Sequence, residues 1–78
     1  MREKQPRIVV TFFTTAGAME MEARCLQMGI SGKLISAPRH LSSDCGIAFS
    51  APMTEEAAIR ALAESGKLEI EGIYREML

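Results

Sequence analysis

Short apolar segments follow one another along this chain of 78 residues in an order that only a few folds accommodate. Four of them are β-branched, aromatic or bounded by glycine and proline, and are predicted as strands. These four are residues 8–13, 33–37, 46–50 and 68–75. In the first, apolar side chains occupy both faces, which is typical of an inner strand that is covered on both sides.

Two further segments carry apolar residues at steps of three and four and are predicted as helices. The first begins at Thr14 or Thr15, either of which can cap a helix, and ends at Gly29. The second begins at residues 54–56 (Thr-Glu-Glu) and ends at Gly66. The predicted buried stripes are Ala18, Met21, Cys25 and Met28 with Leu26 beside them, and Ala58, Ile59, Leu62 and Ala63.

The resulting order β-α-β-β-α-β predicts an α+β fold of the ferredoxin-like type. In this two-layer sandwich, both helices cover one face of a four-stranded antiparallel sheet. We expect a single domain over residues 1–78, with residues 1–6 as a loosely ordered tail. Because alternate residues of a strand face opposite ways, Val9 and Phe13 are expected on the face without helices. An uncovered apolar face usually marks a dimer or partner surface, so a homo-oligomer is predicted.

Composition and charge argue against several classes of partner. The net charge is −1, aromatic residues make up 5% and there is no tryptophan. The chain therefore has neither the positive field nor the stacking surface of a nucleic-acid-binding protein. No apolar run approaches the roughly 20 residues of a membrane-spanning helix. Residues 1–7 are polar and charged, unlike a signal peptide, so a cytoplasmic protein without a membrane partner is expected.

The chain has only two cysteines and one histidine, too few to complete a structural zinc site. No metal is expected within one chain, and both thiols are expected to be reduced. Cys25 shares a predicted buried stripe and is therefore assigned to the core. The acidic residues near the C-terminus are expected to form a solvated face, comprising Glu64, Glu69, Glu71 and Glu76.

Cys45 is the candidate for chemistry. It stands where a loop meets a strand, and Gly46 beside it leaves the sulfur approachable. Residues that stabilise a thiolate precede it in the loop, namely Arg39, His40, Ser42 and Ser43. The alternative interpretation is an ordinary connecting loop with an inert cysteine, because serine, aspartate and glycine are also turn formers.

The predicted topology adds a further feature. The loop that carries Cys45 lies at the same end of the sheet as the start of the first helix, at Thr14 and Thr15. The free amides and the positive end of that helix favour a negative sulfur. Asp44 acts in the opposite sense, because an adjacent carboxylate disfavours a thiolate.

The chain resembles the putative selenium/sulfur carrier protein-like family, a group of small bacterial domains. The resemblance extends from the first strand to Tyr74 and rests on Pro38-Arg39, Ser42-Ser43, Cys45-Gly46 and Glu71-Gly72-Ile73-Tyr74. It implies that Cys45 is the loop cysteine of that family. Asp44 stands where another serine would be more usual.

The resemblance and the loop together predict a carrier rather than a turnover enzyme. Cys45 would hold sulfur or selenium as a persulfide or selenenyl sulfide, without a cofactor, between a donor and an acceptor protein. The residues expected to assist it are Arg39, Ser42, Ser43, Gly46, Thr14 and Thr15. The alternative is a small interaction or regulatory module that uses its sheet face, with Cys45 incidental. A metal site shared by His40 and Cys45 in a dimer is the third hypothesis.

Overall fold

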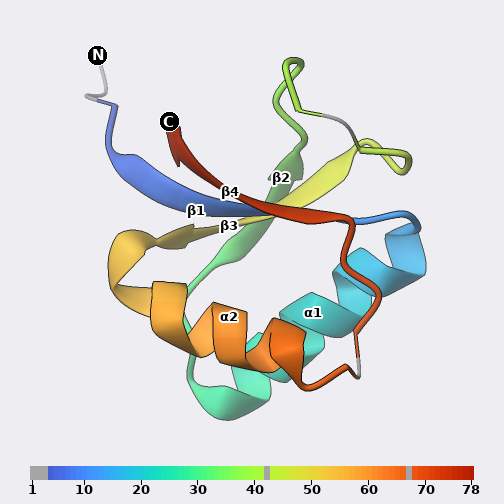
Figure 1. Cartoon of the computed structure of the whole chain (residues 1–78), viewed down its shortest axis with the longest axis vertical. Helices are drawn as coiled ribbons and strands as arrows, with labels where there is room; N and C mark the ends of the chain where they lie inside the picture. Colours follow the sequence, from blue (N-terminus) through green and yellow to red (C-terminus); the bar gives the residue numbers. More distant parts are fainter. Residues whose placement is uncertain (1–3, 42, 67) are drawn as a thin grey trace.

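The sheet of the computed structural model, which describes residues 4–41, 43–66 and 68–78, is antiparallel and has four strands. Its strands are β1 (Pro6–Thr11), β2 (Lys33–Ser36), β3 (Ile47–Pro52) and β4 (Gly72–Met77). They lie in the order β2-β3-β1-β4, so β1 is an inner strand, as its two apolar faces predict (Figure 1). The element order β-α-β-β-α-β confirms the predicted ferredoxin-like fold.

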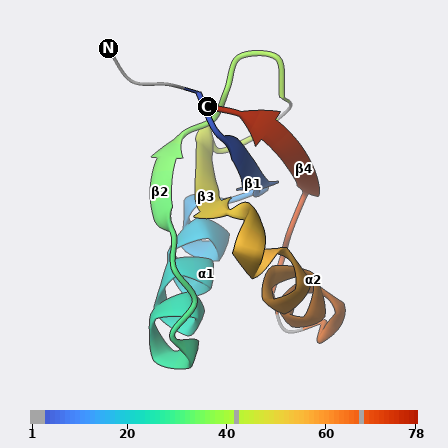
Figure 2. The same cartoon turned by 90° about the vertical axis from the view of Figure 1, so that its left-hand side faces the viewer.

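Both helices pack against one face of the sheet, as predicted (Figure 2). They are α1 (Thr15–Met28) and α2 (Glu56–Glu64), the latter preceded by a single 3₁₀ turn (Met53–Glu55). The core between the layers contains Phe12 from the end of β1, Met21 from α1 and Ile59 from α2. Within the described residues, neither helix is both long and apolar enough to cross a bilayer.

The ends of α1 are those that the sequence predicts. Thr14 caps the helix, with its Oγ1 accepting the N–H of Gly17 at 3.1 Å. Gly29 ends it at φ +73°, a left-handed conformation that glycine adopts without strain. The predicted burial of Met28 is wrong, because it is 58% exposed in the last turn and Ile30 fills the core instead. Leu26 is 81% exposed, since it lies about 100° round the helix from Cys25 and so outside the buried stripe.

Other element boundaries differ from the prediction. β4 begins at Gly72 rather than at residue 68, because β1 ends at Thr11, the partner of Gly72. Leu68 is nevertheless buried, which explains why the segment before β4 has a strand-like apolar pattern. At the start of the chain, Gln5 pairs with Leu78 through two backbone hydrogen bonds, so this part of the expected tail extends the sheet. Residues 1–3 lie outside the described residues.

The start of α2 also differs. The 54–56 segment was expected to open the helix, but α2 begins only at Glu56 and Glu55 makes no capping hydrogen bond. The Glu55 carboxylate instead accepts the backbone N–H of Ser31, which links this turn to the segment before β2. Glu56 accepts hydrogen bonds from Arg60 at 2.9 Å and from Arg75 at 3.0 Å, which joins α2 to β4.

The described loop residues 37–41 and 43–46 lie as a third layer on the face without helices (Figure 1). The loop leaves the sheet at the β2 edge but contacts the opposite edge. There, His40 Nε2 lies 2.5 Å from Glu76 Oε1, and the N–H of Asp44 donates to Glu71 Oε1 at 3.3 Å. Val9, on the sheet beneath, is fully buried. The prediction of an exposed apolar sheet face is therefore wrong for Val9, because the loop folds back over it, whereas Phe13, beyond the end of β1, is 49% exposed.

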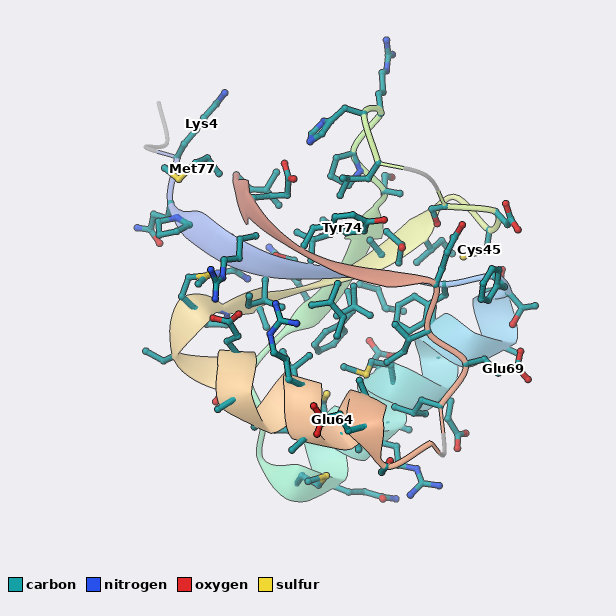
Figure 3. All side chains as sticks on the ribbon, in the orientation of Figure 1. Lys4, Cys45, Glu64, Glu69, Tyr74 and Met77 are labelled. Carbon is teal, nitrogen blue, oxygen red and sulfur yellow. The ribbon has the colours of Figure 1, made fainter. Side chains whose placement is uncertain are left out.

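The Tyr74 ring lies on the same face as this loop (Figure 3). Tyr74 pairs with Val9, and its ring folds back over Gly72, where a Cβ would come within 2.6 Å of the Tyr74 hydroxyl. Thr11, which pairs with Gly72, is fully buried on this face. Only glycine at position 72 leaves room for this arrangement.

Thr11 gives a test of the packing on this face. Its Oγ1 is buried and has no hydrogen-bond partner in the part of the chain that the structure describes. Thr11→Val keeps the shape and removes the unpaired hydroxyl, so we expect a gain of about 1 kcal/mol in the free energy of unfolding. Ser50→Ala is the matched control: its hydroxyl accepts from Arg7 Nε at 2.9 Å, so stability should fall. Thermal melts of both variants measure this, and a lower melting temperature for Thr11→Val would contradict it.

Candidate functional site

Cys45 lies in the turn that leads into β3, at the end of the sheet where α1 begins. The register of β1 and β3 pairs Thr11 with Ala48. Three residues further along each strand are Thr14 and Cys45, which therefore lie at the same end. Figure 3 shows Cys45 beside the beginning of α1. The turn and the helix N-terminus thus meet where the topology predicts.

The thiol of Cys45 is half-buried and contacts the start of β3 and Ser43. Its Sγ donates to the carbonyl oxygen of Ile47 at 3.5 Å and lies 3.9 Å from Ser43 Oγ. The Ser43 hydroxyl also donates to the Ile47 carbonyl, at 3.2 Å. Gly46, the next residue, has φ +74°, and beyond its chain neighbours no atom lies within 4 Å of the place where a Cβ would be. The turn is therefore anchored to the start of β3.

Among the residues that the structure describes, the charged groups placed at this turn are carboxylates. Asp44 is exposed and its backbone N–H donates to Glu71 Oε1. The Glu69 carbonyl oxygen lies 3.1 Å from the place where a Cβ of Gly17 would be. Residues 69–71 therefore connect the first turn of α1 with the Cys45 turn. The Glu69 side chain is exposed, as predicted, whereas the Glu71 side chain accepts a hydrogen bond that no local sequence pattern reveals.

Arg39 and His40 belong to a different turn. The N–H of Leu41 donates to the Pro38 carbonyl at 3.0 Å, which closes that turn separately. His40 contacts Glu76, which lies five residues beyond Glu71 on an extended chain, about 16 Å away along the strand. The His40 imidazole is therefore directed to the other end of β4, and Arg39 precedes it in the same separate turn.

The remaining predicted site residues are Thr14, Thr15 and Ser42. The Thr14 hydroxyl is used as the helix cap, and Thr15 is exposed in the first turn of α1. Ser42 lies outside the described residues. Within those residues, no group of three or more histidine, cysteine, aspartate or glutamate side chains could hold a metal ion.

Cys25 is the second thiol, and its surroundings differ from those of Cys45. It is 1% exposed in the core, as its helical spacing predicts. Burial raises the pKa of the Cys25 thiol, and the nearby carboxylate of Glu55 raises this pKa further. Of the two thiols, only Cys45 lies at the surface in a turn.

These features define a small α+β domain with one accessible thiol at the end of its sheet. Residues 7–75 match the family described as putative Se/S carrier protein-like, and the chain belongs to this family. The matched region extends from β1 into β4 and includes the Cys45 turn. No match was found among curated proteins or among solved structures.

Proposed function

We propose that this protein carries sulfur or selenium on the Sγ of Cys45, between a donor protein and an acceptor protein. The position of Cys45 is the observation that carries the proposal: it is half-buried in a surface turn, whereas Cys25 is in the core. Membership in the Se/S carrier family supports the choice of cargo. Ser43 and the first-turn amides of α1 are the groups that would stabilise a negative sulfur.

The chemistry consists of two exchange steps. In loading, the Cys45 thiol loses its proton and its sulfur attacks the outer sulfur of a donor persulfide. The new Sγ–S bond forms as the donor S–S bond breaks, and the donor leaves as a thiolate that takes up the proton. In delivery, an acceptor thiol attacks the same outer sulfur and Cys45 leaves. Each step conserves electrons, and outer selenium would follow the same course.

A transfer assay tests this proposal. The protein is first loaded with glutathione persulfide, and the excess persulfide is removed. It is then mixed with an acceptor thiol, and the intact mass of the protein is measured over time. We expect one sulfur atom per chain, which is lost again when the acceptor is added. Cys45→Ser should abolish loading without unfolding the protein, and Cys25→Ser is the matched control that should still load. Unchanged loading of Cys45→Ser would refute the proposal.

A further inference from the structure

Helix α1 carries a second apolar stripe besides the one that it buries in the core. The second stripe consists of Ala16, Met19, Ala23 and Leu26, all of them exposed. Their steps of three, four and three residues are those of the a and d positions of a heptad, which form the seam between paired helices. We call these four residues the α1 seam.

The exposure of the α1 seam sets it apart from scattered surface residues. Met19 is 58% exposed and Leu26 is 81% exposed. Single exposed apolar residues are ordinary on protein surfaces, but a continuous stripe usually marks an interaction site. A shallow, mostly polar hollow borders the seam and is lined by Glu20, Ala23, Arg24 and Gln27. The seam is therefore an exposed apolar stripe with a polar border.

Charges beside the α1 seam indicate what charge a partner helix should carry. Glu20 and Glu22 flank the seam on its two sides, at the heptad positions that face a partner's charges. Arg24 lies outside those positions and pairs with Glu20 at 3.4 Å. A second copy packed antiparallel through this seam would bring acidic flanks together, which is unfavourable. Lysine or arginine on the partner helix would be attracted instead.

The α1 seam begins at the end of the sheet where Cys45 lies. Ala16 lies in the first turn of α1, which begins at the same end of the sheet as the Cys45 turn (Figure 3). Asp44 and Glu69 are exposed at that end of the molecule and add negative charge there. One end of a helix docked along the seam would therefore lie at the same end of the molecule as the thiol.

We propose that the α1 seam is the docking surface for a basic amphipathic helix of the protein that exchanges sulfur with Cys45. The identity of that protein as a sulfur partner rests on the proposed carrier function, whereas docking of the helix does not. The apolar stripe supplies contact area, the acidic flanks favour a basic partner, and the seam begins at the end of the sheet that carries the thiol.

A designed peptide pair tests the docking surface. Each peptide is a helix of about 21 residues with leucine at a and d. One carries lysine at e and g, and the other carries glutamate there. We expect the lysine peptide to bind at least tenfold more tightly at low salt, with a preference that shrinks as salt is added. Fluorescence anisotropy of labelled peptide measures both affinities.

Two variants distinguish binding at the α1 seam from non-specific hydrophobic binding elsewhere on the surface. Leu26→Ser should weaken binding of the lysine peptide at least tenfold. Met77→Ser is the matched control, because Met77 is 56% exposed on β4 and lies far from Cys45 in Figure 3. Binding should be unchanged in this control. Equal binding of Leu26→Ser and wild type, or equal binding of the two peptides, would overturn the docking proposal.

Sedimentation and the Cys45→Ser variant complete the test. A dimer that Leu26→Ser dissociates would assign the seam to a second copy and would also overturn the proposal. Cys45→Ser should bind the lysine peptide as wild type does, because docking is non-covalent. Sulfur loading that fails while the peptide binds would refute the carrier function alone. Loading that succeeds while the peptide does not bind would refute the docking surface alone.

Discussion

Phe49→Ala should lower the free energy of unfolding by about 3–5 kcal/mol, at least a quarter of the total. Phe49 is 1% exposed, and its ring lies so close to Gly32 that a Cβ there would be 2.3 Å from Cζ. Truncating a buried phenylalanine typically costs about 3–5 kcal/mol, because the cavity adds to the lost burial. A domain of this length is stable by roughly 4–12 kcal/mol. Urea denaturation followed by circular dichroism measures the loss.

The matched control for this prediction is Phe13→Ala. Phe13 is 49% exposed at the end of β1, so its truncation should change the free energy of unfolding by no more than about 0.5 kcal/mol. The contrast between these two phenylalanines tests the assignment of Phe49 to the core. Similar losses in the two variants would contradict it.

Cys45 should react with N-ethylmaleimide at least 100-fold faster than Cys25 in the native protein. Cys45 lies in a surface turn, whereas Cys25 is 1% exposed and its thiol pKa is raised by burial and by Glu55. Reaction at Cys25 requires local opening of the core, and an opening free energy of roughly 3 kcal/mol already corresponds to about a 100-fold slower reaction.

The comparison is made within one chain, so that concentration and pH are identical for both thiols. Peptide mass spectrometry after timed quenching gives the two rates separately. In urea above the unfolding midpoint, the two rates should converge, which is the internal control. Equal rates in the native protein would contradict the assignment of Cys25 to the core and of Cys45 to the surface.

The fold was predicted because its signals are local. The β-branched segment at β1, the threonine cap and left-handed glycine of α1, and the proline that bounds β3 each act within a few residues. Burial was predicted less well in α1. Periodicity identified the stripe of Ala18, Met21 and Cys25 but could not show that α1 also exposes Leu26.

The site was predicted only in part because its remaining contacts are long-range. The position of Cys45 beside the start of α1 follows from topology. The contacts of Asp44 with Glu71 and of His40 with Glu76 join residues 27 and 36 positions apart. Such contacts leave no periodic trace in a single sequence. The acidic character of the Cys45 turn and the separate place of Arg39 became visible only in three dimensions.

Locating the sulfur atom after a single loading reaction tests the central claim most directly. Wild-type protein is exposed to one equivalent of glutathione persulfide, the persulfides are trapped by alkylation, and tandem mass spectrometry identifies the modified cysteine. The carrier function predicts that the added sulfur is on Cys45 and that Cys25 remains an unmodified thiol. Sulfur on Cys25, or on neither residue, would contradict it.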